Sequence, residues 1–334
     1  MNSETFFSFI IPVYNTQDYI ENCVNSIIDQ KFDAYEIILI NDGSNDNSGE
    51  ICKYLASNNK RILYFEQSNQ GLGMTRNIGC NIANGEYILF IDSDDRLKPN
   101  TIKLLFDRII AENEPDIVEF GYEIVTNSLS KKRQINTEAS LCGTEYLDFV
   151  LDQEEIYEWY AWKYAFKRFF WKKNQMGFPI GKYEDVSAVP FIILEASRVV
   201  SLDIVIYQYY RGRPGAITSQ TSIETEKDKL SVIKTNIKKM TCKEDIKDHL
   251  KVNFLNNMSL LFYSICILVY SFDNHEADEL LEVIKQNLWI TSYTLKRYKR
   301  QYVVSRLIRI VGLECTCRLL NIRRMVKERV ESGK

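Results

Sequence analysis

The sequence has few of the residues that interrupt regular structure: six prolines and fourteen glycines among 334 residues. It also lacks low-complexity tracts and internal repeats, which excludes collagen-like, linker-rich and solenoid architectures. Apolar residues make up 45% and charged residues 26%, as in an ordinary globular protein. The length predicts about two domains.

Signals for export and for membrane spanning are missing as well. The N-terminus has no basic segment followed by an apolar run, so we expect no signal peptide. The most apolar late stretch, residues 258–272, contains Ser259, Ser264 and Ser271 and falls short of the roughly twenty apolar residues that a membrane span needs. We expect a buried helix there.

Cysteine and histidine show no metal-binding pattern. The eight cysteines are scattered, and the spacing of Cys315 and Cys317 suits neither a zinc ribbon nor a redox pair. Free thiols indicate a reducing cytoplasm. The two histidines, His249 and His275, are expected to be ordinary helical residues.

Short apolar runs alternate with helical patterns through the first 125 residues. The runs predict strands over residues 7–13, 36–40, 62–65, 86–91 and 116–120. Between the first two, apolar residues from Ile20 to Ile28 recur at helical spacing, and Asn15 or Thr16 could cap that helix. Further helices are expected up to about residue 57, over 73–83 and after Pro99. This order predicts an α/β fold with a mainly parallel sheet flanked by helices.

Polar clusters follow three of the strands, at Tyr14-Asn15, at residues 41–44 and at residues 92–95. Sheets of this kind bind ligands at the carboxyl ends of their strands. Asp92 and Asp94, on one side of an extended strand end, could hold Mg²⁺ or Mn²⁺ against phosphate oxygens, or could form a solvated acidic turn. Asp42 is either a turn residue or an acceptor for a base N–H.

Two common nucleotide-binding signatures are excluded. Gly71-Leu72-Gly73 resembles half of a dinucleotide fingerprint, but Arg76 stands where the third glycine belongs, and the segment follows the third strand. The chain has no P-loop pattern. An arginine on a helix facing the site could instead hold a diphosphate or a base carbonyl.

Four motifs together resemble the signature of family 2 glycosyltransferases with the GT-A fold. They are Ile11-Pro12-Val13-Tyr14-Asn15, Asn41-Asp42-Gly43-Ser44, Arg76-Asn77-Ile78-Gly79 and Phe90-Ile91-Asp92-Ser93-Asp94-Asp95. The resemblance covers residues 6–122 and weakens towards residue 220. It implies inverting transfer of a hexose or N-acetylhexosamine from a UDP-sugar to a glycan or lipid-linked acceptor in surface polysaccharide synthesis.

The resemblance also implies roles for individual residues. Tyr14 and Asp42 would contact uracil, Arg76 would lie near the base and diphosphate, Asp92 would bind ribose or a metal-bound water, and Asp94 would ligate Mn²⁺ or Mg²⁺. The same donor site would include Pro12, Val13, Asn15 and Ser93.

Downstream, Glu184-Asp185 resembles the family's general-base motif, with Asp185 as the base and Glu184 orienting it or the acceptor. An exposed acidic pair at a helix start is the alternative. Arg211 and Arg213 lie in a segment that resembles a mobile loop stabilising the leaving diphosphate, although a solvated surface loop would look the same. Trp162 and Lys163 resemble part of an acceptor site.

The C-terminal segment is strongly basic. Residues 294–329 contain eleven lysines and arginines and two glutamates, a net charge of 11 − 2 = +9, so the rest of the chain carries −12. Val303, Val304, Leu307, Ile308, Ile310 and Val311 are expected on one helical face, opposite Ser305, Arg306 and Arg309. Such a helix either lies on an anionic membrane surface or packs on the protein body.

We therefore expect three parts: residues 1–125 as the nucleotide-sugar-binding half, 126–220 as the acceptor-binding half, and 221–334 as a helical region with a basic amphipathic tail. The protein is expected in the cytoplasm, peripheral to the inner face of the cell membrane, and no nucleic-acid partner is expected. A sugar nucleotidyltransferase and a non-catalytic nucleotide-sugar or nucleic-acid binding module are the alternatives. A sugar nucleotidyltransferase would normally carry a glycine-rich basic loop after strand one, and this sequence lacks one.

Overall fold

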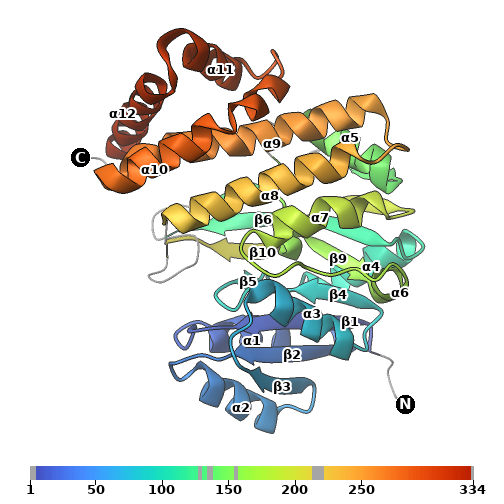
Figure 1. The fold of residues 1–334 in the computed structure, drawn as a ribbon. Coiled ribbons are helices and arrows are strands. Elements are labelled where there is room, and N and C mark those ends of the chain that lie inside the picture. Colours follow the sequence, from blue (N-terminus) through green and yellow to red (C-terminus); the bar gives the residue numbers. More distant parts are fainter. Residues whose placement is uncertain (1–4, 127–129, 134–137, 154–156, 213–221, 332–334) are drawn as a thin grey trace. The chain divides into compact units, whose positions relative to one another are not determined.

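The computed structural model describes residues 5–126, 130–133, 138–153, 157–212 and 222–331, with side chains up to residue 326 (Figure 1). The chain forms two compact units. The first contains Met1–Tyr146 and Trp159–Ser219, and the second contains Leu147–Glu158 and Gln220–Lys334.

The first unit is built on one sheet with the strand order β3-β2-β1-β4-β9-β6-β10-β5, to which β7 and β8 add beside β6 and β10. The strands are β1 (Phe7–Val13), β2 (Tyr35–Asp42), β3 (Ile62–Gln67), β4 (Tyr87–Phe90), β5 (Arg96–Leu97), β6 (Ile117–Val125), β7 (Ser130–Arg133), β8 (Ala139–Leu141), β9 (Tyr164–Lys167) and β10 (Val199–Tyr210). As predicted, the first four strands pair in parallel: β1 pairs with β2 and with β4, and β2 pairs with β3. Antiparallel β9, between β4 and β6, makes the complete sheet mixed.

Helices cover both faces of this sheet. They are α1 (Ile20–Ile28), α2 (Ser48–Asn58), α3 (Leu72–Ile82), α4 (Ile102–Ala111), α6 (Arg168–Lys173), α7 (Glu184–Leu194), the short η1 (Ala161–Lys163) and the start of α5 (Gly143–Gln153). Successive residues of a strand point to opposite faces. Phe7 and Phe9 pack in the core that includes Ile27 of α1, while Ile10 faces α3. A Cβ added at Gly79 of α3 would lie 2.3 Å from Ile10 Cγ2, so this glycine permits the close approach of helix and strand.

The predicted cap of α1 is not formed. The helix begins at Ile20, and no side chain accepts a hydrogen bond from its first turn. The backbone carbonyl of Thr16 instead accepts bonds from the N–H groups of Tyr19 and Ile20. The Thr16 N–H donates to Ser48 Oγ, so this segment is tied to the next loop rather than used as a cap.

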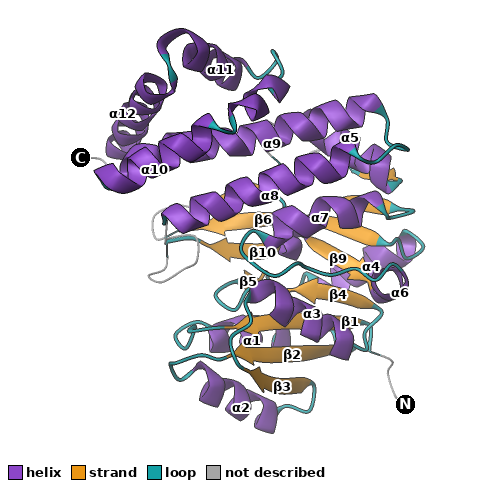
Figure 2. Ribbon diagram, viewed as in Figure 1, coloured by secondary structure: helices purple, strands orange, loops and turns teal. Residues whose placement is uncertain are grey.

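The second unit is helical (Figure 2). Beyond the remainder of α5, its elements are α8 (Ile223–Thr241), α9 (Asp248–Leu268), η3 (Val269–Ser271), α10 (Asn274–Lys285), η4 (Leu288–Tyr293), α11 (Lys299–Val311) and α12 (Leu313–Glu331). The α9–η3 segment, Asp248–Ser271, is long and apolar enough to cross a membrane, but 72% of its apolar window is buried inside the protein. Met258, Phe262 and Cys266 are fully buried, which confirms the predicted core helix.

Burial on the tail helix does not follow the predicted division into an apolar and a polar face. On α11, Ser305 is buried with Ile308, whereas Val303 and Ile310 are 52% and 78% exposed. The small Ser305 side chain satisfies its hydroxyl within the helix by donating to the carbonyl of Tyr302, so burial costs it no hydrogen bond.

Candidate active site

The loops that follow β1 and β2 are joined by hydrogen bonds. The Asn15 N–H donates to Ser44 Oγ at 3.1 Å, and the Asn45 N–H donates to Asn15 Oδ1 at 2.8 Å. Asn15 has a φ of +51°, a left-handed conformation that asparagine tolerates. Its neighbour Tyr14 is 44% exposed, so this edge of the sheet offers an aromatic ring to a ligand. Two further predicted donor-binding residues are buried in β1: Pro12 and Val13.

Asp42, at the end of β2, fixes the loop before α3. Its Oδ1 accepts hydrogen bonds from Gln67 Nε2 and the Gln70 N–H, both at 2.8 Å, and Oδ2 accepts one from the Gly71 N–H at 2.9 Å. A carboxylate has about four acceptor positions. About one acceptor position therefore remains for a base N–H. The positive φ of Gly43, +72°, fits the predicted turn, and the contact of Asp42 with a base stays a prediction.

Arg76 is the buried centre of the site. Its Nη1 donates to Glu184 Oε1 at 2.6 Å and its Nη2 donates to Asp92 Oδ1 at 3.0 Å. The rings of Phe90 and Phe178 lie 5.8 and 5.4 Å from the guanidinium carbon. Arg76 therefore holds together two carboxylates that are far apart in the sequence. This contact to carboxylates was not foreseen from the sequence, which pointed to a diphosphate or a base.

The acidic segment after β4 forms a turn, which is one of the two predicted alternatives, and not an extended strand end. The strand ends at Phe90, and the Asp95 N–H donates to the Asp92 carbonyl at 3.0 Å. Asp92 and Asp94 are half-buried on this turn, and Ser93 is buried. The turn directs the Asp95 side chain into the protein interior, where it is buried.

Asp95 connects the acidic turn to β10. Its Oδ2 accepts a hydrogen bond from the Tyr207 hydroxyl at 2.8 Å, and its Oδ1 accepts one from the Tyr210 N–H at 2.7 Å. The Tyr207 hydroxyl in turn accepts from the Asp92 N–H at 3.0 Å. Burial, and then the charges of Asp94 and Asp92, raise the pKa of Asp95 well above its ordinary value. Sequence reasoning missed Tyr207, because no local pattern marks a partner more than a hundred residues away.

Glu184 and Asp185 begin α7. Tyr183 just before them has a φ of +58°, and the left-handed turn directs the chain into the helix. Glu184 is buried against Arg76, while Asp185 is half-buried and accepts a hydrogen bond from the Val186 N–H. Glu184 and Asp92 therefore share Arg76 as a partner, and Asp185 is the next residue to Glu184.

The surroundings of Asp185 favour its protonated form. Burial and the adjacent charge of Glu184 raise the pKa of Asp185 to about 7, and Arg76 opposes that rise. Burial likewise raises the pKa of Asp92 above its ordinary value, again against the effect of Arg76. A carboxylate that titrates near neutral pH is suited to accept a proton from a hydroxyl group.

The two predicted acceptor-binding residues are buried. Trp162 is stacked between Tyr160 and Tyr207, with ring centroids 4.8 and 4.3 Å away. Lys163 forms a buried ion pair with Glu119, with 3.0 Å between Nζ and Oε1. In this structure neither side chain is presented to a ligand, and an acceptor contact for them stays a prediction.

The arginines of the predicted loop are described only in part. The Arg211 N–H donates to the Val125 carbonyl at 2.9 Å, and the Arg211 guanidinium lies 5.0 Å from the Tyr209 ring. This contact places Arg211 at the end of β10, directly after the Tyr210 that Asp95 holds. Arg213 lies outside the described residues.

Comparison with known proteins gives a consistent picture. The family model described as "Glycosyl transferase family 2" matches residues 8–183. The chain is 34% identical over 221 residues to glycosyltransferase GlyA of Streptococcus pneumoniae, 33% over 222 residues to the uncharacterized glycosyltransferase EpsJ of Bacillus subtilis, and 32% over 221 residues to GlyG of S. pneumoniae. Each match covers 63% of this chain. It spans 31% of GlyA, 62% of EpsJ and 72% of GlyG.

Among solved structures, S. aureus TarS 1-349 in complex with UDP superimposes with a TM-score of 0.71 at 19% identity, over 98% of this chain and 92% of TarS 1-349. The same protein in complex with UDP-GlcNAc gives a TM-score of 0.70. The mannosyltransferase PcManGT from Pyrobaculum calidifontis, in complex with GDP-Man and Mn²⁺, gives 0.52. At these identities the likeness establishes the fold, a mixed α/β sheet with flanking helices and a helical C-terminal region.

Proposed function

The chain belongs to glycosyl transferase family 2, and we propose that it moves a hexose or N-acetylhexosamine from a UDP-sugar, with inversion, to a glycan or lipid-linked acceptor in surface polysaccharide synthesis. The observation that carries the proposal is the cluster of Asp92, Glu184 and Asp185 around Arg76 at the carboxyl edge of the sheet. The family model shows membership of the family. The glycosyl transfer itself, its donor, its acceptor and its stereochemistry are the proposed part.

A uridine donor is supported by the fold and by the exposed edge of the sheet. TarS, which shares the fold, forms complexes with UDP and UDP-GlcNAc. In this chain Tyr14 is exposed beside the end of β1, and Asp42 retains about one acceptor position for a base N–H. A base that stacks on Tyr14 and donates to Asp42 would be placed where strands β1 and β2 end.

A divalent cation fits the residues of the acidic turn. No group of three His, Cys, Asp or Glu side chains among the described residues is arranged to coordinate a metal ion. Mg²⁺ and Mn²⁺ in nucleotide sites are commonly held by one or two carboxylates together with phosphate oxygens and water. Asp94, with Asp92, would supply those carboxylates, and the ion would neutralise charge on the leaving diphosphate.

In the proposed reaction Asp185 is the general base. Its carboxylate takes the proton from the acceptor hydroxyl as the acceptor oxygen bonds to the anomeric carbon. The bond from that carbon to the phosphate oxygen breaks on the opposite face, so the configuration inverts and UDP leaves. Arg76 keeps Asp92 and Glu184 in place through this step, and Arg211, at the end of β10, would supply positive charge for the diphosphate.

The test is UDP release from a panel of UDP-sugars in the presence of Mn²⁺, with the wild type and with Asp94→Ala and Asp185→Asn. We expect one donor to be turned over, activity to be lost in Asp94→Ala, and Asp185→Asn to turn over at least about a hundredfold more slowly while still binding UDP. Asp203→Asn, an exposed carboxylate on β10, is the matched control.

Turnover of a guanosine or thymidine diphosphate sugar but of no UDP-sugar would overturn the donor assignment. Full activity of Asp185→Asn would overturn the role of the base. The configuration of the product, read from the coupling constant of its anomeric proton, decides between inversion and retention.

A further inference from the structure

Helix α12 exposes a continuous apolar stripe. Leu319, Ile322 and Val326 are 51%, 58% and 56% exposed, and Cys315 is exposed as well. These positions follow the spacing i, i+4, i+7, i+11, which places them along one side of a helix. The opposite side of α12 carries the buried Cys317. The stripe therefore faces away from the core of the second unit.

Helix α11 adds to this surface. Val303 and Ile310 are seven residues apart, so they share one side of the helix, and both are more than half exposed. Exposed arginines flank them at Arg306 and Arg309. An apolar strip bordered by exposed cations is the pattern of a helix that lies in a membrane interface.

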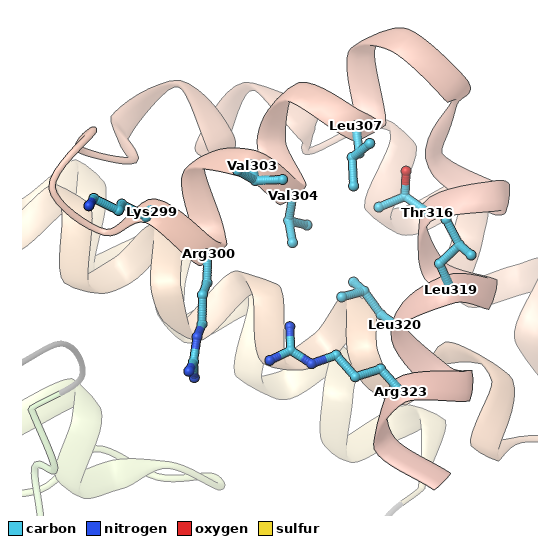
Figure 3. A pocket seen from close by; sticks show the side chains of 9 residues that line it. All are labelled: Lys299, Arg300, Val303, Val304, Leu307, Thr316, Leu319, Leu320 and Arg323. Carbon is cyan, nitrogen blue, oxygen red and sulfur yellow. The ribbon is translucent and has the colours of Figure 1, made fainter. Parts of the chain in front are cut away.

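A groove of about 380 Å³ separates the two helices. Val304, Leu307 and Leu320 project into it, and Arg323 extends from α12 towards the α11 side (Figure 3). Lys299 and Arg300 also line it. Apolar walls with cations from both helices gathered at one end suit a molecule with a hydrocarbon part and an anionic head (Figure 3).

The positive charge of this surface distinguishes between three possible partners: a second copy of the chain, a nucleic acid and an anionic lipid surface. Residues 294–329 contain eleven basic and two acidic side chains, a net charge of 11 − 2 = +9. A second copy of the chain would bring the same positive charge to the interface and be repelled. A nucleic acid would satisfy the arginines but would leave the stripe of α12 in water. An anionic lipid surface satisfies both the cations and the apolar side chains.

We propose that α11 and α12 dock on an anionic phospholipid bilayer. The stripe of α12 and the exposed apolar residues of α11 enter the interface, an acyl chain occupies the groove, and lipid phosphates contact Lys299, Arg300 and Arg323. This surface lies outside the proposed donor site, so docking is independent of the transferase assignment.

Vesicle flotation tests the proposal with the full chain. Phosphatidylcholine vesicles, with and without about one third phosphatidylglycerol, are mixed with protein at low and high salt. We expect binding only to the anionic vesicles, and weaker binding at high salt because added salt screens the lipid charge. Inorganic phosphate should not compete at millimolar concentration, which separates a bilayer from a simple phosphate site.

Two variants test the two parts of the surface. Leu319→Gln/Ile322→Gln removes apolar contact, and Val252→Gln, a 44% exposed valine on α9, is its control. Arg300→Gln/Arg323→Gln removes two cations and should lower the partition constant on the order of twentyfold, or about fivefold per charge. Lys234→Gln/Lys238→Gln on α8 removes the same charge from exposed positions elsewhere and serves as its control.

Loss of binding in both test variants with retention in both controls supports the proposal. Failure of the wild type to bind anionic vesicles would overturn it, as would test variants that bind as well as the controls. A wild-type dimer in gel filtration that Leu319→Gln/Ile322→Gln dissociates would show that a second copy covers the stripe, and would also overturn it.

Discussion

At the scale of single residues, the ionisation of Asp185 sets the pH range in which it could act as a base. Its pKa is raised to about 7, mainly by burial and by Glu184. Because a base must be deprotonated, we expect kcat/KM to rise with pH through about 7 and to level off above it. UDP release measured from about pH 5.5 to about 8.5 gives this profile. The apparent pKa belongs to the carboxylate cluster as a whole.

The same shift has a consequence for stability. A carboxyl with a raised pKa binds its proton more tightly in the folded state, so its ionisation opposes folding as pH rises from about 4 to about 7. Asp185→Asn cannot ionise there. Its unfolding midpoint should therefore exceed that of the wild type at about pH 8, and the difference should vanish near pH 4. A rate profile without an acid limb, or a difference that does not depend on pH, would contradict the assignment.

Arg76 offers a second prediction at this scale. It opposes the rise in the pKa of Asp185 and contacts both Asp92 and Glu184. Arg76→Gln removes the positive charge, so we expect the acid limb of kcat/KM to move above pH 7. Breaking the buried pairs should also cost about 3–5 kcal/mol of stability. Unfolding by urea and the pH profile of UDP release measure the two effects.

The control for Arg76 is Arg61→Gln, since Arg61 forms an exposed pair with Asp33 at 2.8 Å. That exposed pair should contribute about 0–1 kcal/mol and leave the pH profile unchanged. If Arg76→Gln kept the acid limb in place while losing stability, Arg76 would stabilise the fold without setting the ionisation of the base.

At the scale of elements, the link between β10 and the acidic turn can be tested at Tyr207. Its hydroxyl donates to Asp95 and accepts from the Asp92 N–H, while its ring stacks on Trp162. Tyr207→Phe keeps the stack and leaves buried polar groups unsatisfied, which should cost about 1–3 kcal/mol. Turnover should fall as well, because the turn that carries Asp94 loses a support.

Thermal unfolding and UDP release check this prediction, with Tyr64→Phe on β3 as the matched control. The Tyr64 hydroxyl donates to Glu66 at 3.1 Å in an exposed contact. It also accepts a long bond of 3.5 Å from Asn41 Nδ2, which keeps Glu66 as a second partner, so the loss of the hydroxyl should change stability by less than about 0.5 kcal/mol. Equal effects of the two substitutions would argue against a specific role for the Tyr207 hydroxyl.

Elements also show what the sequence could and could not predict. The strands and helices of the first 125 residues were predicted because their periodicity is local, and the parallel pairs β1–β2 and β1–β4 follow from that alternation. The insertion of antiparallel β9 was not predictable, since it depends on pairing with β4 and β6 across long sequence separations. The turn at residues 92–95 was one of the two predicted alternatives, but the contacts of Asp95 with Tyr207 and Tyr210 were not predictable for the same reason.

For the candidate site, too, local patterns were predictable and long-range contacts were not. Motifs identified Asp42, Arg76 and Asp185, but not what they contact, because each partner comes from another segment. Arg76 meets Glu184 over 108 positions of sequence. Ser305 of α11 shows the limit for the tail, where the hydrophobic spacing left open which face of the helix is covered. Tertiary packing, not spacing, decided which side of that helix is covered.

At the scale of the whole molecule, two separate cores predict two unfolding transitions. Cys23, Cys52 and Cys80 are buried in the sheet unit, whereas Cys266 and Cys317 are buried in the helical unit. Apart from α5, which is divided between the units, each core is assembled from its own elements, so each unit should unfold cooperatively, as multi-domain chains commonly do. Brief alkylation at increasing denaturant, read residue by residue by mass spectrometry, follows both units in one sample.

Ligand binding should shift the unfolding of the first unit only. UDP with Mn²⁺ would bind only the folded first unit, and at a hundred times its dissociation constant would stabilise that unit by about 2.7 kcal/mol. The first three cysteines should therefore become reactive at higher denaturant when UDP is present, while Cys266 and Cys317 keep their midpoint. The exposed Cys242 and Cys315 should react throughout and serve as internal standards. A common midpoint for all five buried thiols, shifted together by UDP, would mean that the two units unfold as one.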